Sequence, residues 1–264
     1  MEKKIKLFRR LEIETQSTCN RHCSTCLRNS IPDRESVAPW FTKNQLSLQD
    51  IERVLQESQA AGFRGEVCLS HYNEPLQDER IVEIAKMVRS MGFSRLFFCT
   101  NGDYLTEDLA AQLDGLLDDA GIALYMEDPV RSKRREWIKS LFKKTRLNIS
   151  NGEHMVTHYS PLIETGNLVK SNRGNACHHP TVRMIVNHRG QMLLCCDDLT
   201  GNFDLGTIHE KSVEELWFGE KHQNYVIELS RRGGRKIHPH CLSCPRAGLW
   251  AHRESLPREL IRKK

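Results

Sequence analysis

Strand-like and helix-like segments alternate between residues 7 and 150, and this alternation limits the possible fold more than any other feature of the sequence. After each short apolar run, apolar residues recur at helical spacing, as Ile51, Val54 and Leu55 do behind the capping residue Ser47. Repeated strand–helix units predict parallel strands in an α/β fold. Because this stretch is too short for the eight units of a closed barrel, which need about 250 residues, we expect a partial barrel of five or six units. The expected strands are Leu7–Thr15, Glu66–His71, Arg95–Cys99, Ile122–Met126 and Leu147–Ser150.

The pattern changes after about residue 165. Two strand-like runs, Thr181–His188 and Gln191–Cys196, flank the dipeptide Arg189–Gly190 and predict a β-hairpin. The segment Pro239–Pro245 is expected to be a loop. We expect a partial barrel over residues 1–165, a small C-terminal α+β domain over residues 166–250 and a basic tail over residues 251–264.

The composition excludes a disordered or membrane-embedded chain. Of the 264 residues, 39% are hydrophobic and 28% are charged, and the mean hydropathy is −0.54. No apolar run reaches the roughly 20 residues that span a bilayer, and no apolar signal segment follows the basic start of the chain. We therefore expect a cytoplasmic protein with no membrane partner.

The net charge of +5 is mild for a chain of this length. Three basic clusters, Lys133–Arg135, Arg231–Lys236 and Arg262–Lys264, are candidates for contact with phosphates. No aromatic residues alternate with these charges, as stacking platforms for bases would require. The clusters are therefore expected to be solvated surface, and nucleic acid is not an expected partner.

The cysteine content indicates metal or redox chemistry. In a chain expected to be cytoplasmic, ten cysteines favour metal ligands over disulfides. Cys19, Cys23 and Cys26 follow directly after the first expected strand. Three thiolates at this spacing can hold three irons of a [4Fe–4S] cluster, and the fourth iron then stays open to a ligand with an amine and a carboxylate. Zinc is the alternative, with His22 as the nearest further ligand.

A second set of cysteines lies in the C-terminal part of the chain. Its four well-separated thiols are enough to close a second [4Fe–4S] cluster that has no open iron. A zinc site is again the alternative, because zinc accepts four thiolates in tetrahedral geometry. The expected ligands are Cys177, Cys195, Cys241 and Cys244.

Three motifs at successive strand ends resemble those of the radical S-adenosylmethionine (SAM) superfamily. They are the cysteine trio, the stretch His71–Leu76, which is similar to the superfamily's GGEP motif, and the stretch Cys99–Gly102, which is similar to its strand-end TNG. The resemblance implies that SAM binds at the open iron and that Glu74 holds its methionine amine. Tyr72 and Asn73 stand in place of the two glycines of GGEP. The SAM-binding residues that the resemblance implies are Tyr72, Asn73, Glu74, Thr100, Asn101 and Gly102.

The C-terminal cysteines resemble the twitch form of the SPASM domain, a small auxiliary domain that carries one further cluster beside a radical SAM barrel. In that form the spacing from Gly190 favours Cys195 as the ligand, while its neighbour Cys196 stays an alternative. The resemblance therefore implies two [4Fe–4S] clusters and SAM as cofactors. It also implies an electron donor of the flavodoxin or ferredoxin type as a partner.

Within the superfamily, the length and the order of motifs are similar to those of dehydrogenases that oxidise an aminocyclitol alcohol to a ketone. The resemblance implies that a radical made from SAM removes a hydrogen atom from the substrate and that the auxiliary cluster takes the electron. Arg173, in the turn Ser171–Gly174, and His71 are the candidate proton acceptors. A sugar or an aminocyclitol is the expected substrate.

Two other functions stay open at this point. A radical SAM epimerase or peptide-modifying enzyme needs a thiol that donates a hydrogen atom, and Cys196 is the candidate. Cys68 and Cys99 are expected to be small buried residues on strands. A non-enzymatic iron–sulfur or zinc protein is more distant, because an electron carrier has no use for a SAM contact such as Glu74.

Overall fold

The computed structural model describes residues 5–23, 26–29, 44–152, 176–199 and 201–244. The strands in these ranges are β1 (Arg10–Ile13), β2 (Glu66–Cys68), β3 (Arg95–Thr100), β4 (Asp119–Leu124), β5 (Arg146–Asn151), β6 (Arg183–Val186) and β7 (Met192–Leu193). They form one sheet in the order β5-β4-β3-β2-β1-β6-β7, in which all neighbours run parallel except β6 and β7. All five expected barrel strands are present, so the predicted α/β partial barrel is confirmed.

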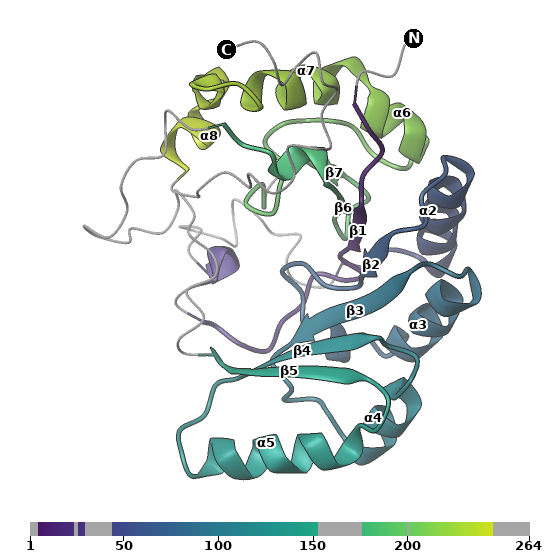
Figure 1. The fold of residues 1–264 in the computed structure, drawn as a ribbon, viewed down its shortest axis with the longest axis vertical. Coiled ribbons are helices and arrows are strands. Elements are labelled where there is room, and N and C mark those ends of the chain that lie inside the picture. Colours follow the sequence, from purple (N-terminus) through teal and green to yellow (C-terminus); the bar gives the residue numbers. More distant parts are fainter. Residues whose placement is uncertain (1–4, 24–25, 30–43, 153–175, 200, 245–264) are drawn as a thin grey trace.

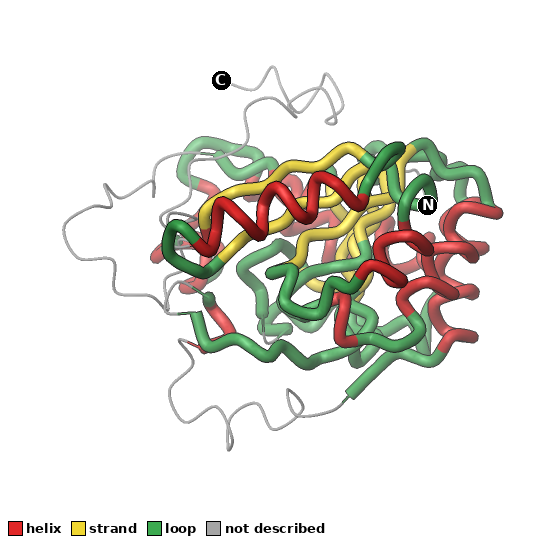
Figure 2. The backbone as a smooth tube through the Cα atoms, turned by 90° about the horizontal axis from the view of Figure 1, so that it is seen from below, coloured by secondary structure: helices red, strands yellow, loops and turns green. Residues whose placement is uncertain are grey.

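Four helices follow the barrel strands: α2 (Leu48–Ala60), α3 (Ile81–Ser90), α4 (Glu107–Leu113) and α5 (Val130–Leu141). Figure 1 shows α2, α3 and α4 on the outer side of the curved sheet, while the short purple helix η1 (Leu27–Asn29) lies on the concave side. The view from below in Figure 2 brings α5 to the front, where it lies along the strands at the edge of the sheet. In the ranges described, each helix falls short of the length and apolar character that a bilayer crossing demands.

Local sequence signals explain where these helices begin. The hydroxyl of Ser47, the N-cap of α2, accepts a hydrogen bond from the backbone N–H of Asp50. Thr106 caps α4 in the same way through the N–H of Leu109. These bonds satisfy backbone donors that the first turn of a helix leaves unpaired. Both caps therefore set the point at which the chain leaves the preceding loop.

The fourth strand–helix unit differs from the expectation. The strand expected at Ile122–Met126 already begins at Asp119, because α4 ends at Leu113. The carboxylate of Asp114, the residue after α4, accepts hydrogen bonds from three consecutive backbone N–H groups at residues 143–145. Gly115 follows with a φ of +86°, which a residue with a side chain rarely adopts. These two features turn the chain from α4 directly into β4.

The C-terminal residues extend the same sheet. β6 pairs in parallel with β1, and the chain returns as the antiparallel strand β7, so the predicted hairpin is confirmed.

The expectation of a loop at Pro239–Pro245 is wrong, because a one-turn helix, α8 (Pro239–Ser243), begins there. Nδ1 of His238 accepts the N–H of His240, and proline at the first position suits a helix start. The other helices are η3 (Pro75–Gln77), η6 (His179–Thr181), α6 (Val213–Phe218), α7 (Glu220–Leu229) and η7 (Gly234–Ile237).

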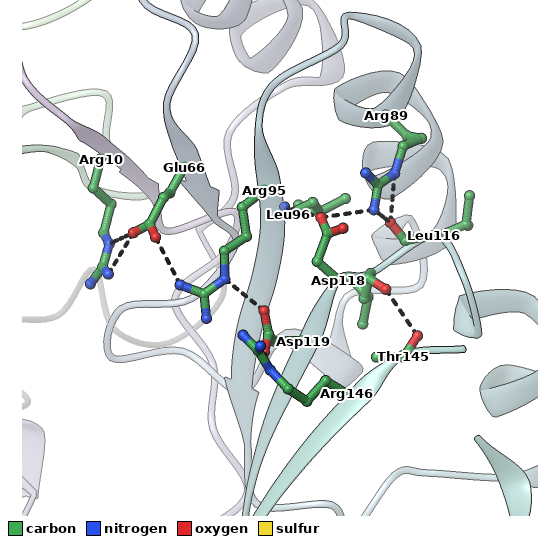
Figure 3. A network of polar contacts seen from close by, with 11 residues as sticks. Arg10, Glu66, Arg89, Arg95, Leu96, Leu116, Asp118, Asp119, Thr145 and Arg146 are labelled. Carbon is green, nitrogen blue, oxygen red and sulfur yellow. Dashed lines mark hydrogen bonds and ion pairs between the residues drawn. The ribbon is translucent and has the colours of Figure 1, made fainter. Parts of the chain in front are cut away.

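Charged side chains from the first residue of each barrel strand form a ladder across the sheet (Figure 3). Glu66 accepts hydrogen bonds from Arg10 at 2.6 Å and from Arg95 at 2.8 Å. Asp119 accepts from Arg95 at 2.6 Å and also pairs with Arg146. Burial acts to raise the pKa of both carboxyls, but the guanidinium groups on either side hold each pKa below its ordinary value. The ladder occupies the N-terminal end of the strands, opposite the ends that carry the sequence motifs.

Candidate active site

The three motifs identified in the sequence meet in one cavity at the C-terminal ends of β1, β2 and β3. This is the end of parallel barrel strands at which such folds build their active sites. Gly102, the last predicted residue of the group, lies beside the cavity and donates its N–H to the hydroxyl of Thr100 at 3.0 Å. The predicted residues that line the cavity are Cys19, Cys23, Cys26, His71, Tyr72, Asn73, Glu74, Thr100 and Asn101.

Glu74 ties the second motif to the third. Its carboxylate accepts the backbone N–H of Asn101 at 2.8 Å and that of Leu76 at 3.0 Å, and the hydroxyl of Thr100 donates to the same carboxylate. Burial raises the pKa of Glu74, although these donors act in the opposite direction. An ammonium group beside the carboxylate would offset the free-energy cost of burying its charge. The site therefore fits the amine of SAM.

Hydrogen bonds hold the cysteine loop against these two motifs. The N–H of Glu74 donates to the carbonyl of Thr18 at 2.8 Å, and Nε2 of Gln16 donates to the carbonyl of Glu74 at 2.9 Å. Arg21, between the first two cysteines, forms an ion pair with Asp103 at 2.6 Å, directly after the third motif. Protein contacts alone thus place the loop over the strand ends.

The thiols of this cavity fit an iron–sulfur cluster. Burial raises the pKa of Cys19, and it raises the pKa of Cys26 to about 11. Such thiols become thiolates where a metal supplies positive charge. Within the described ranges, no three His, Cys, Asp or Glu side chains lie close enough to hold one metal ion. A [4Fe–4S] cluster binds each thiolate at a different iron and leaves its fourth iron open, and the three thiols of the cysteine loop, in one cavity with Glu74, suit such a cluster.

The second cysteine set lines a separate cavity in the C-terminal half. The apolar side chains of Pro180, Leu194 and Leu229 form part of its wall. In the part of the chain that the structure describes, Cys196 does not line this cavity, whereas Cys195 does. The geometry therefore favours Cys195 where the sequence left two alternatives. The thiols that reach the cavity are those of Cys177, Cys195, Cys241 and Cys244.

A buried arginine, Arg235, lies beside these four thiols. Burial raises the pKa of Cys241 to about 12 and the pKa of Cys195 well above its ordinary value. Arg235 lines the cavity and donates from Nη1 to the carbonyl of Cys244 at 3.2 Å, while its Nε and Nη2 have no hydrogen-bond partner among the described residues. Its positive charge would offset the negative charge of thiolates that bind a cluster in this cavity. Sequence reasoning missed this residue, whose only signal was its place in the basic run Arg231–Lys236.

His71 faces the first cavity with one ring nitrogen available. Its side chain is 4% exposed, and Nε2 has no hydrogen-bond partner among the described residues. Nδ1 lies 3.7 Å from the carboxylate of Glu12, which also pairs with Arg183 at 3.1 Å. Burial acts to raise the pKa of Glu12, but His71 and the arginines outweigh it and hold this pKa below its ordinary value. Glu12 was missed in the sequence, where a charged residue inside a buried strand was the available signal.

The other predicted catalytic side chains have different surroundings. Arg173 lies outside the described residues. Cys68 is buried on β2, as expected. The same expectation is wrong for Cys99, which is exposed and lines the first cavity. Gly121 on the neighbouring strand leaves room for this thiol, since a Cβ at Gly121 would lie 3.1 Å from Sγ of Cys99.

Two family models match the chain in the same two regions. A model described as the radical SAM superfamily matches residues 13–146, half of the chain, and includes the first cavity's motifs. A model described as SPASM, an iron–sulfur cluster-binding domain, matches residues 177–245 and includes all four thiols of the second cavity.

Proteins of known function and structure are similar along most of the chain. The S-adenosyl-L-methionine-dependent 2-deoxy-scyllo-inosamine dehydrogenase of Niallia circulans is 21% identical over 247 residues, which cover 90% of this chain and 93% of that protein. The crystal structure of BtrN in complex with AdoMet and 2-DOIA matches with a TM-score of 0.76 at 20% identity, over 92% of this chain and 95% of that chain. Native anSMEcpe with bound AdoMet has a TM-score of 0.58 at 13% identity, over 89% of this chain and 88% of that chain. The chain belongs to the radical SAM superfamily, and its cofactors are SAM, a [4Fe–4S] cluster in the barrel and further iron–sulfur binding in a C-terminal SPASM domain.

Proposed function

We propose that this chain oxidises an alcohol of a sugar or aminocyclitol to a ketone. When bound, SAM and its cluster supply a radical that removes a hydrogen atom from carbon, and the auxiliary cluster supplies a one-electron acceptor. The observation that carries the proposal is the second cavity, where four thiols leave no iron open and apolar side chains form much of the wall. Such a site suits electron transfer rather than substrate binding. The name of the Niallia circulans dehydrogenase supports the substrate class.

The proposed cofactor contacts follow the two cavities. Glu74 holds the amine of SAM, and the neighbouring polar groups of the second and third motifs orient the rest of the molecule. The barrel is proposed to span residues 1–165, the SPASM domain residues 166–250 and the basic tail residues 251–264. The first cluster binds Cys19, Cys23 and Cys26, the second binds Cys177, Cys195, Cys241 and Cys244, and SAM contacts Tyr72, Asn73, Glu74, Thr100, Asn101 and Gly102.

His71 is proposed to take the proton that leaves the substrate hydroxyl. His71 lines the cavity, and its Nε2 is buried without a hydrogen-bond partner among the described residues. Glu12, on the other side of the ring, would stabilise the imidazolium that forms, in the way that a carboxylate orients a catalytic histidine. Arg173 is the second candidate for directing this proton. A donor protein of the flavodoxin or ferredoxin type is the proposed source of the electron that starts each turnover.

A reaction with purified components tests the proposal. The full-length chain is reconstituted anaerobically with iron and sulfide, then mixed with SAM, dithionite and a panel of sugars and aminocyclitols. We expect one substrate to lose two hydrogen atoms, seen by mass spectrometry, with one 5′-deoxyadenosine formed per ketone. Cys177→Ala is the matched variant, and it should still make 5′-deoxyadenosine but little ketone. A product with the mass of the substrate would contradict oxidation.

The exposure of Cys99 favours one second candidate, an epimerase. Its thiol lines the cavity that holds the SAM motifs, a better place for a hydrogen donor than that of Cys196, which lines neither cavity among the described residues. The thiol would give a hydrogen atom to the substrate carbon, and one electron from the donor protein with one proton would restore it. Deuterium from heavy water at an inverted carbon, absent in Cys99→Ala but present in Cys196→Ala, would establish this reaction.

A further inference from the structure

We propose that Tyr72 is a positioning residue that links the substrate cavity to the auxiliary cluster by holding the backbone next to Cys195. The inference rests on the proposed oxidation, in which one electron passes from the substrate to the second cavity. Tyr72 stands where the superfamily's motif has a glycine, so its side chain has a role in this chain that the motif itself does not explain.

The side chain of Tyr72 spans the two cavities. The residue is 5% exposed and lines the first cavity beside His71, whose ring it meets edge-on at 4.6 Å. Its hydroxyl donates a hydrogen bond of 2.6 Å to the carbonyl of Cys196. Cys195, the preceding residue, lines the second cavity with its thiol. The ring of Tyr72 and its hydrogen bond therefore connect His71, the proposed proton acceptor, to the backbone next to Cys195, a proposed cluster ligand.

The backbone of Tyr72 is fixed to the same C-terminal hairpin. Its N–H donates to Oε1 of Glu14 at 3.2 Å, and Oε2 of Glu14 pairs with Nδ1 of His188 at 2.6 Å. The side chains of Glu14 and His188 are 2% and 1% exposed, and His188 lies between β6 and β7. Burial acts to raise the pKa of Glu14, but the contact with His188 holds it below its ordinary value. A shift of Tyr72 against the hairpin would thus break buried polar contacts at both its backbone and its hydroxyl.

This connection affects how the electron leaves the substrate. In the proposed oxidation, the substrate carbon would lose one hydrogen atom to the radical that SAM supplies, and the hydroxyl would give its proton to His71. The one electron that remains would pass to a cluster held by the four thiols of the second cavity. A path through covalent bonds and one short hydrogen bond carries an electron better than a gap across space does. The hydroxyl of Tyr72 lies close to the proposed ligand Cys195 and holds its backbone in place. The partial positive charge of this hydrogen-bond donor also favours the reduced, more negative state of the cluster.

The variant Tyr72→Phe tests the inference because it removes only the hydroxyl. In the reconstituted full-length chain, we expect the midpoint potential of the auxiliary cluster, followed by electron paramagnetic resonance, to shift downward. We expect the ratio of 5′-deoxyadenosine to oxidised product to rise about tenfold, as is common when a hydrogen bond behind a metal ligand is lost. The potential is measured without substrate, so this readout does not depend on the reaction that the enzyme catalyses.

Tyr104→Phe is the matched control. Tyr104 is an exposed tyrosine whose hydroxyl accepts a hydrogen bond from Gln77 at 2.9 Å, and its loss should change neither value. If Tyr72→Phe does not load its clusters, difluorotyrosine at position 72 keeps the contact as a stronger donor and should shift the potential upward. An unchanged potential in the variant that loads would overturn the inference. A shifted potential in a protein that forms no ketone would overturn the oxidation and support the contact.

Discussion

The two cysteine-lined cavities differ in how the chain brings their thiols together. Three thiols of the first cavity, those of Cys19, Cys23 and Cys26, are close together in the sequence, and they meet the thiol of Cys99 and polar groups from two neighbouring strand ends. The second collects four thiols from residues 177–244 and surrounds them with three apolar side chains and with Arg235 and His240. The first cavity is thus built from a local motif on a barrel edge, and the second only from distant segments that fold against one another.

The contents of the two cavities also differ, and the difference separates two tasks. In the first, Nε2 of His71 and Nδ2 of Asn73 are buried and have no hydrogen-bond partner among the described residues, which suits a cavity that receives a polar ligand. In the second, Nε and Nη2 of Arg235 are also buried without a hydrogen-bond partner among the described residues, but they lie beside four thiols, which suits a bound cluster with thiolate ligands. One cavity is therefore suited to an exchangeable ligand and the other to storing an electron.

The strongest test of this division removes the first set of thiols. The triple variant Cys19→Ala, Cys23→Ala, Cys26→Ala should lose all 5′-deoxyadenosine formation, because the cluster that binds SAM loses its three proposed ligands. The auxiliary cluster should keep its absorption and paramagnetic spectra, since the two cavities share no thiol. Iron and sulfide analysis with quantified 5′-deoxyadenosine measures both effects. Continued SAM cleavage in this variant would break the comparison.

A pair of adjacent substitutions tests which thiol serves the second cavity. Cys195→Ala should abolish the auxiliary cluster's signal, while Cys196→Ala should retain it. The reason is that, in the described part of the chain, Cys195 lines the second cavity and Cys196 does not. Iron content and paramagnetic spectra of the two variants, prepared in parallel, give the comparison. The reverse order of the two losses would show that Cys196 is the ligand.

A smaller effect is expected from Glu74→Gln in the first cavity. The substitution keeps the shape of the side chain and removes the charge that faces the proposed SAM amine. SAM affinity should fall by about 1.5–3 kcal/mol, the value of a hydrogen bond to a charged group, or about 10- to 150-fold in the dissociation constant. Calorimetry measures this loss, and the spectrum of the auxiliary cluster serves as the control. Unchanged affinity would remove Glu74 from the SAM site.

The smallest effect is expected at the far end of the barrel from both cavities. Arg146 ends the charged ladder of Figure 3, and its side chain is 74% exposed. Arg146→Ala should lower the free energy of unfolding by less than about 1 kcal/mol, as is typical of an exposed ion pair. Denaturant titration measures the change. SAM cleavage should stay as in the wild type, and a loss of it would mean that the ladder shapes the distant cavity.

Local patterns in the chain were sufficient to predict much of the first half. Apolar periodicity and the caps Ser47 and Thr106 depend on neighbours a few residues apart, so the strand–helix units could be found without a structure. The end of α4 could not, because Asp114 is satisfied by N–H groups about thirty residues later. Such a contact exists only after β5 has joined the sheet.

The candidate site also has one part that the sequence predicted and another that only the structure showed. By itself, the sequence determined the cysteine trio, the Glu74 motif and the set of four later cysteines, because their residue types and spacings carry the chemistry. Only the tertiary structure placed Cys195 rather than Cys196 at the second cavity, exposed Cys99 to the first cavity and joined Tyr72 to the C-terminal hairpin. Each of these depends on which way a side chain turns and on what packs against it from a distant segment. Spacing along a chain does not contain that information, since burial and long-range hydrogen bonds are set only when the sheet closes around them.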